Sequence, residues 1–353
     1  MSPAVSPRQL SFAEALTSYP SRNPAGTILY KVVQENLETF IQETESNPNS
    51  KGLPEYVKRE FYEYLGCGCL ARGFLRLQCT ECRHESILPF SCKGRAFCPS
   101  CGGRRMSELA AFLVDEVIPH VPIRQVVLSF PFPVRLWISK SPKLQTQLLT
   151  ITIRAYSHLL RKKAKAQGLT QKLQHAVVTV IQRFGGSINL NPHFHSLWVD
   201  GLYDVSQKDP VFVELPLPTD DEIRELVEII SNRIIRCLKR KGYRVDEFSG
   251  EQQENDEMFE EVQSASVQSI IALGERRGKK VRRLGMVEAG SFEGAVLEGP
   301  RCASHKGFSL HANLSCSAEE RDKLEHMARY IARPPHCYRQ ASLETRWSHH
   351  IPS

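Results

Sequence analysis

The chain has 353 residues, a formal net charge of +7 and 41% hydrophobic residues, values typical of a globular protein with two or three folded units. No apolar run approaches the ~18 residues of a membrane span. Residues 1–26 are polar and rich in proline and serine, unlike a signal peptide. We therefore expect a disordered N-terminus, a place inside the cell and no membrane partner.

Two helices are predicted ahead of a cysteine-rich module. Apolar side chains recur at helical spacing over 27–43, and a shorter helix is expected over 54–65. A segment rich in asparagine, proline and serine separates them. These helices and the module should form an N-terminal unit.

The cysteine module predicts bound zinc. Seven of the eleven cysteines lie between Cys67 and Cys101, in the paired spacing that metal sites use. Two Cys-x2-Cys knuckles fifteen residues apart can together complete a closed, structural zinc site. The predicted ligands of this site are Cys79, Cys82, Cys98 and Cys101. A second zinc site could use Cys67, Cys69, His84 and Cys92, although buried free thiols explain those cysteines equally well.

Helices and strands alternate after the module. A helix is predicted over 106–118 and a strand over 123–130, which prolines end. A helix over 144–167 separates this strand from another over 176–182. Turn-rich residues then lead into a strand over 193–199, which we expect to pair antiparallel with the strand before it.

A His-x-His pair in the last of these strands predicts a metal site. Alternate side chains of a strand share a face, so His193 and His195 point the same way while Phe194 enters the core. Two neutral imidazoles can hold one divalent ion and leave positions open for substrate oxygens. Ordinary strand histidines are the plain alternative. Gln182 is the expected third ligand, and His311 competes with it.

Three cationic stretches favour a nucleic-acid partner. They span 161–165, 236–241 and 276–283, with an acidic segment over 246–261 after a helix predicted over 219–241. A single stretch of this kind is usually only a solvated surface, but three in one chain shift the balance towards DNA or RNA. The last stretch contains Lys279, Lys280, Arg282 and Arg283.

A strand and a capped helix are predicted near the end of the chain. The strand spans 307–314. Ser317 and Glu320 have the spacing of a capping box, so a helix should start there and run to about Ala332, before Pro334.

Tyr330 near the end of this helix is a candidate nucleophile. A phenol can attack covalently, and neighbouring cations such as Arg329 and Arg333 would favour phenolate and hold a phosphate. Half-buried packing is the ordinary role of a helical tyrosine, so the spacing alone leaves both interpretations open.

Five segments in consistent order resemble the HUH rolling-circle transposases of bacterial insertion sequences that carry an N-terminal zinc-binding domain. The cysteine module ends in Cys-Lys-Gly-Arg-Ala-Phe-Cys-Pro-Ser-Cys, and the other segments include Asn-Pro-His-Phe-His and Arg-Tyr-Ile-Ala-Arg-Pro-Pro. The five segments are 67–101, 182–185, 189–195, 307–312 and 329–335.

The resemblance implies an α+β fold, in which an HUH-type antiparallel sheet with flanking helices follows a small Cys-rich zinc-binding domain. It also implies that His193 and His195 hold Mg²⁺ or Mn²⁺, which polarises a phosphate in single-stranded DNA at mobile-element ends. Tyr330 would attack that phosphate, leaving a 5′-phosphotyrosine and a free 3′-hydroxyl, with Arg329 and Arg333 on the DNA. His326 stands where two-tyrosine members carry their other tyrosine, so the chain resembles the single-tyrosine branch.

The expected organisation is a disordered N-terminus over 1–26, a helical and zinc-binding unit over 27–106, a catalytic unit over 107–335 and a tail over 336–353. The tail is shorter than the resemblance implies, so a truncated, non-catalytic, zinc-dependent DNA-binding remnant is one alternative. A plasmid-type replication initiator, which shares the nicking chemistry, is another. The expected location is the cytoplasm, with the bacterial nucleoid.

Overall fold

The structure is a computed structural model that describes most of the chain between residues 26 and 335. The described residues are 26–46, 52–94, 97–169, 172–185, 189–243, 262–263, 265–267, 270–271, 277–279 and 296–335. The acidic segment over 246–261 and the tail over 336–353 lie outside them, as do residues 1–25 of the predicted N-terminus.

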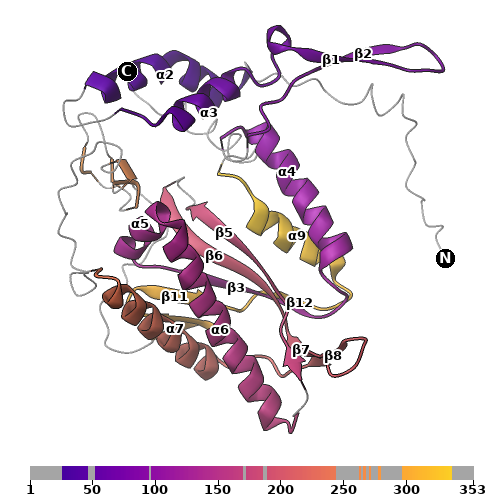
Figure 1. Ribbon diagram of the computed structural model, residues 1–353, viewed down its shortest axis with the longest axis vertical. Helices are drawn as coiled ribbons and strands as arrows, with labels where there is room; N and C mark the ends of the chain where they lie inside the picture. Colours follow the sequence, from indigo (N-terminus) through magenta and orange to yellow (C-terminus); the bar gives the residue numbers. More distant parts are fainter. Residues whose placement is uncertain are drawn as a thin grey trace.

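Two helices and a β-hairpin form the N-terminal unit (Figure 1). The helices α2 (Ile28–Ser46) and α3 (Glu55–Leu65) closely match the predicted ones. A short turn, η2 (Leu70–Arg72), leads into the hairpin of β1 (Phe74–Gln78) and β2 (Glu85–Pro89), which projects from the helices. The core of the unit is small and includes buried cysteines; its apolar members are Val33, Leu37, Ile41, Leu53 and Tyr64.

The helix α4 (Pro99–Phe112) joins the N-terminal unit to the rest of the molecule. It begins seven residues earlier than the predicted 106–118 helix, because Pro99 lies in its first turn, where a missing N–H costs nothing. The π-helical turn η3 (Leu113–Val117) follows it. Since α4 runs through residue 106, the expected boundary between the two domains falls inside a continuous helix.

The main sheet is antiparallel at every pairing that the structure describes. Its central strand β3 lies between β6 and β11, strands far apart in the sequence. The predicted α+β class, with an antiparallel sheet behind a Cys-rich unit, is confirmed. Across the sheet the strands are β5 (Val177–Phe184), β6 (Leu190–Val199), β3 (Ile123–Ser129), β11 (Phe308–His311), β10 (Cys302–His305) and β9 (Val296–Gly299), and β12 (Ser315–Cys316) also pairs with β3.

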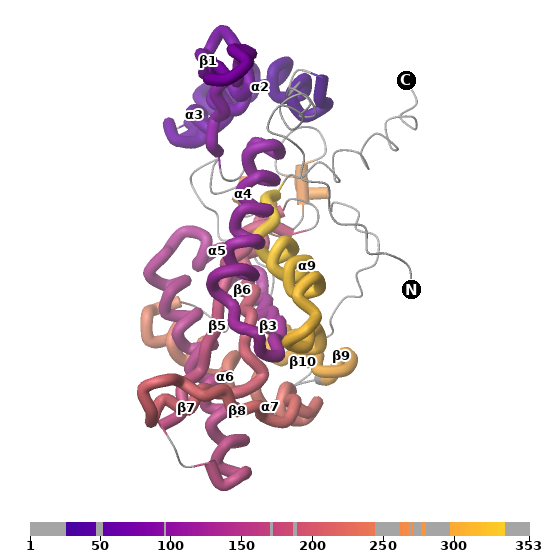
Figure 2. The backbone as a smooth tube through the Cα atoms, turned by 90° about the vertical axis from the view of Figure 1, so that its right-hand side faces the viewer, coloured from indigo at the N-terminus to yellow at the C-terminus, as the bar shows by residue number. Residues whose placement is uncertain are grey.

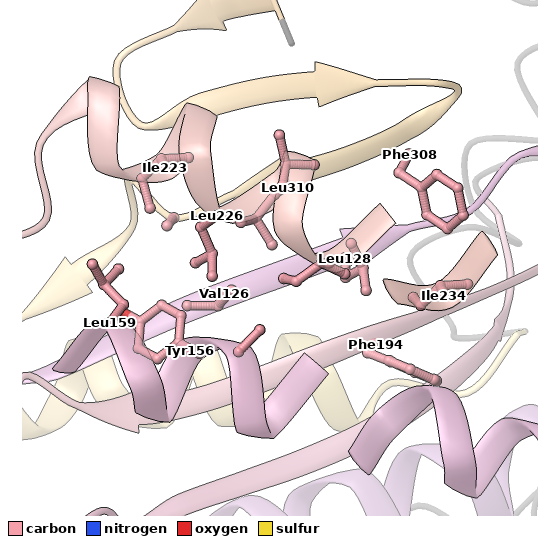
Figure 3. Close-up of a cluster of buried hydrophobic side chains, with 14 of the residues drawn as sticks. Val126, Leu128, Tyr156, Leu159, Phe194, Ile223, Leu226, Ile234, Phe308 and Leu310 are labelled. Carbon is pink, nitrogen blue, oxygen red and sulfur yellow. The ribbon is translucent and has the colours of Figure 1, made fainter. Parts of the chain in front are cut away.

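Three helices cover one face of this sheet, where the larger apolar core lies (Figure 3). They are α5 (Phe132–Lys140), α6 (Pro142–Ala166) and α7 (Asp220–Arg240). The capping box of Thr219 and Glu222 starts α7. A small second sheet comprises β4 (Leu173–Gln174), β7 (Gly201–Asp204) and β8 (Val211–Glu214). None of the described helices has both the length and the apolar character that a membrane crossing requires.

The helix α9 (Arg321–Ala332) covers the other face and runs beside α4 (Figures 1 and 2). It ends where predicted but begins at Arg321, later than the capping box suggested. One of the two hydrogen bonds of that box is present, from the Ser317 N–H to Glu320 Oε2 at 2.8 Å. Glu320 itself is the N-cap, so the helix starts one residue after it. The core between α4, α9 and the sheet includes Ala110, Leu113, Leu324, Met327 and Ile331.

Candidate active site and cysteine cluster

Four cysteine side chains converge at the base of the β-hairpin. The sulfur atoms of Cys67, Cys92, Cys98 and Cys101 all lie within 4.8 Å of one another. The Cys67 and Cys101 sulfurs are 3.7 Å apart, and those of Cys92 and Cys101 are 3.6 Å apart. Sulfurs on a tetrahedron with ~2.3 Å zinc–sulfur bonds lie about 3.8 Å apart. The four thiols therefore have the spacing of a zinc site.

This grouping differs from the predicted quartet. Cys98 and Cys101 do lie together, but Cys67 and Cys92 accompany them in place of the knuckle that starts at Cys79. The reason is the hairpin, since Cys67 lies shortly before β1 and Cys92 shortly after β2, and antiparallel pairing brings these ends together. The knuckle occupies the turn, a five-residue strand away, or ~17 Å.

The knuckle at the hairpin turn is well formed but separate. The backbone N–H groups of Cys82 and Glu81 hydrogen-bond to the Cys79 sulfur, and so lower the pKa of that thiol. Cys69 and His84 are exposed, and the main-chain oxygen of His84 accepts the Cys79 N–H at 2.8 Å. Within the described residues, only the four-cysteine cluster brings three or more candidate metal ligands of the His, Cys, Asp and Glu types together.

The histidine pair lies on β6, on the face of the sheet that α9 covers. His193 and His195 are 8% and 2% exposed, and their ring centroids are 4.7 Å apart. Phe194 points to the opposite face, into the larger core (Figure 3). Its ring lies against that of Phe130, with centroids 4.9 Å apart. The alternation predicted for this strand is therefore present.

Both imidazoles are held neutral. Burial lowers the pKa of His193. Burial lowers the pKa of His195 to about 3, together with repulsion from His193 when that ring is protonated and from Arg333. The Nδ1 atom of His193 donates to the Asn191 carbonyl oxygen at 2.6 Å, which leaves Nε2 as a lone-pair donor. Within the described residues the buried Nε2 of His195 has no hydrogen-bond partner. These donors suit a divalent cation.

Gln182 is placed closer to the histidine pair than His311. It lies directly opposite His193 in the β5–β6 register and is 3% exposed, with its Nε2 3.5 Å from the main-chain oxygen of Tyr330. His311 is exposed and lies level with His195 but two strands away, across Val127, or about 10 Å. Of the two candidates for a third ligand, the register favours Gln182.

Tyr330 reaches the histidine pair from α9. Its ring lies edge-on to that of His195, with centroids 5.6 Å apart and an interplanar angle of 85°. The residue is 48% exposed, so its side chain is accessible to a ligand. The guanidinium carbon of Arg333 lies 5.0 Å from the centre of the Tyr330 ring. His326 is exposed one turn earlier, and its Nδ1 contacts the Asp322 carbonyl oxygen at 2.7 Å.

Two arginines make the surroundings of the histidines cationic. Both Arg333 and Arg135 lower the pKa of His193 by their charge. Arg135 lies on α5, and its side chain donates to the Phe130 carbonyl oxygen. It was not predicted, because no motif marks it and only the fold brings α5 to the end of β6.

The other predicted DNA contacts are less well defined. Arg329 is exposed but pairs with Glu325 on its own helix at 2.6 Å. Lys279 is exposed within a short described piece of chain. Lys280, Arg282 and Arg283 lie outside the described residues.

Comparison with protein families gives two matches in order along the chain. Residues 32–130 match the family described as "Transposase zinc-binding domain". Residues 176–340 match the family described as "Putative transposase". The first match covers the cysteine cluster, and the second covers the histidine pair and Tyr330. Neither the curated proteins nor the solved structures gave a match. Taken together and in this order, the two family matches support an insertion-sequence transposase with an N-terminal zinc-binding domain.

Proposed function

We propose that the protein cuts and rejoins single-stranded DNA at the ends of a mobile element, with Tyr330 as nucleophile, in rolling-circle transposition. The observation that carries this proposal is the approach of the exposed Tyr330 ring to the buried histidine pair, 5.6 Å between ring centroids at His195. A phosphodiester placed between them could contact the phenol oxygen and both imidazole nitrogens. The cationic Arg135 and Arg333 would then neutralise its charge.

The proposed step exchanges one phosphodiester for another. The Tyr330 oxygen attacks phosphorus, a bond to the tyrosine forms, and the bond from phosphorus to the 3′ oxygen breaks. The phenol proton passes to solvent and the leaving 3′ oxygen takes up a proton, so the products are a 5′-phosphotyrosine and a 3′-hydroxyl. The energy of the broken bond stays in the tyrosine–DNA linkage, and strand joining needs no nucleotide cofactor.

His193, His195 and Gln182 would hold a divalent cation, Mg²⁺ or Mn²⁺. The neutral rings and the orphaned, buried Nε2 of His195 fit such an ion. When bound, the ion would supply Lewis-acid polarisation of the phosphate. The chain's own part is to keep both rings neutral, to fix their orientation within the sheet and to present the phenol from α9.

The test is a covalent adduct assay. Purified protein is mixed with single-stranded oligonucleotides from the element's ends and Mn²⁺, and the products are separated under denaturing conditions. The native protein should form a protein–DNA adduct that chelators of divalent cations prevent. Tyr330→Phe should form none. Tyr56→Phe, which removes the hydroxyl of another exposed tyrosine on α3, should form as much as the native protein.

Either of two results would refute the proposed chemistry: an adduct that persists in Tyr330→Phe, or one that is indifferent to chelation. DNA binding that weakens with salt, without any adduct under any metal, would instead support a non-catalytic DNA-binding protein. Adducts formed with a plasmid origin but not with mobile-element ends would support a replication initiator.

A further inference from the structure

A buried glutamine on the central strand contacts the histidine pair. Gln125 lies on β3 and is 3% exposed. Its register partner on β6 is Leu197, two residues from His195, so all three side chains share one face of the sheet. The Gln125 Nε2 lies 2.9 Å from His195 Nδ1.

Two orphaned atoms lie on either side of this contact. Within the described residues, both Gln125 Oε1 and His195 Nε2 are buried without a hydrogen-bond partner. If the amide NH₂ faces the ring, Nδ1 must accept, and the ring proton then sits on Nε2. That proton meets no acceptor, and the amide oxygen meets no donor. This arrangement leaves both ends of the interaction unsatisfied.

Turning the amide by 180° gives the opposite polarity. The Gln125 oxygen then accepts the Nδ1–H of His195, and the Nε2 lone pair becomes available to a cation. His193 already has this arrangement, because its Nδ1 donates to the Asn191 carbonyl oxygen at 2.6 Å. Both rings then offer Nε2 to the same ion. Ligating histidines usually donate their other N–H to such an acceptor.

We propose that Gln125 is a positioning residue that accepts the Nδ1 proton of His195 and thereby sets the affinity of the histidine pair for a divalent cation. The inference deepens the proposed function and rests on its metal site. The two histidines differ in one respect, since a main-chain oxygen orients His193 whereas a replaceable side chain orients His195. Gln125 is therefore the point at which metal affinity can be changed without touching a ligand.

The test is Mn²⁺ binding to the zinc-loaded protein without DNA, followed by the electron paramagnetic resonance signal of free Mn²⁺. Gln125→Met keeps the length of the side chain but removes the acceptor, and should weaken binding about 10- to 100-fold. Gln125→Glu keeps only acceptors, and should bind Mn²⁺ at least as tightly as the native protein. Gln145→Met alters a comparably buried glutamine on α6, across the sheet, and should change nothing.

The inference is overturned if Gln125→Glu loses as much affinity as Gln125→Met, or if folded Gln125→Met binds normally. Nitrogen NMR of histidine-labelled native protein reports the tautomer of each imidazole independently of metal binding. The His195 signals are those that disappear in His195→Gln. The Nδ1-protonated form is expected, and the Nε2-protonated form would overturn the inference even if a variant fails to fold. If the native protein and the variants bind Mn²⁺ as expected but no DNA adduct forms, the proposed function is refuted while the role of Gln125 in metal binding stands.

Discussion

Among the charged residues that the structure describes, Arg124, which lies outside the candidate site, is the most completely buried. Its Nε and Nη2 atoms each donate to Asp200 at 2.8 Å, and its Nη1 donates to the Ala312 carbonyl oxygen at 2.7 Å. Arg124 is 0% and Asp200 4% exposed. One guanidinium thus ties the central strand to the segments that follow β6 and β11. A buried ion of this kind is tolerated only while its partner is present.

Removal of one partner should therefore be far more costly than removal of both. Arg124→Met leaves the Asp200 carboxylate buried and unpaired, and should lower the free energy of unfolding by about 3–5 kcal/mol in urea titrations. The double variant Arg124→Met with Asp200→Leu should recover most of that loss. Arg76→Met breaks the exposed pair with Glu85 and should cost about 0–1 kcal/mol. Equal losses for the buried and exposed pairs would contradict this account.

At the scale of elements, the first turn of α4 packs closely against the Arg-Pro-Pro motif that follows α9. A methyl group added at Gly102 would lie 2.7 Å from Pro334 Cβ, whereas one added at neighbouring Gly103 would meet nothing within 4 Å. A proline ring cannot move aside as a flexible side chain can. Gly102 therefore permits an approach that holds the residues after Tyr330 against the first turn of α4.

Two alanine variants one residue apart should have opposite effects. Gly102→Ala should destabilise the protein by about 1–3 kcal/mol through overpacking and should reduce adduct formation by shifting the end of α9. Gly103→Ala should stabilise it by about 0.5–1 kcal/mol, because alanine favours a helix over glycine. Urea unfolding of both proteins measures the difference. Similar stabilities would show that the contact with Pro334 relaxes without cost.

Elements with strong local patterns were predicted well, and those set by tertiary contacts were not. The helices predicted over 27–43, 144–167 and 219–241 agree with α2, α6 and α7 within a few residues. The helix α5 was missed because prolines 131 and 133 were interpreted only as strand terminators, although proline is accepted in a first helical turn. The cysteine grouping in the structure differs from the predicted one because it depends on hairpin pairing, which spacing alone does not reveal.

The same distinction holds for the candidate site. Alternation along β6 predicted that His193 and His195 share a face. Strand pairing then placed Gln182 beside them, as the antiparallel expectation implied. Gln125 and Arg135 could not be predicted, because neither belongs to a motif and each reaches the histidines only through the folded arrangement of β3 and α5.

At the scale of the whole molecule, the two segments that match protein families contribute strands to the same sheet. The zinc-binding match ends at residue 130 and so includes β3. In the sheet, β3 lies between β6 and β11, which both belong to the second match. The N-terminal match therefore supplies the central strand of the sheet that carries the histidines. Neither matched segment contains the complete main sheet by itself.

Zinc removal should consequently affect the whole molecule. Two of the clustered cysteines, Cys98 and Cys101, lie at the start of α4, the helix that packs along α9. We expect Cys67→Ser to release the clustered zinc, lower the melting temperature and reduce adduct formation. Cys79→Ser, at the hairpin turn, should retain that zinc. Atomic absorption and thermal unfolding test both, and loss of the same ion from Cys79→Ser would favour the quartet first predicted from the spacing.

The two-sided character of β6 restricts how this strand can vary. Phe194 and Trp198 belong to the core on one side, while His193 and His195 face α9 on the other. Adding or deleting one residue here would invert every following side chain, which would place an imidazole in the apolar core and a phenyl ring on the face that α9 covers. Homologues should therefore tolerate substitutions within 190–199 but not single-residue insertions or deletions there.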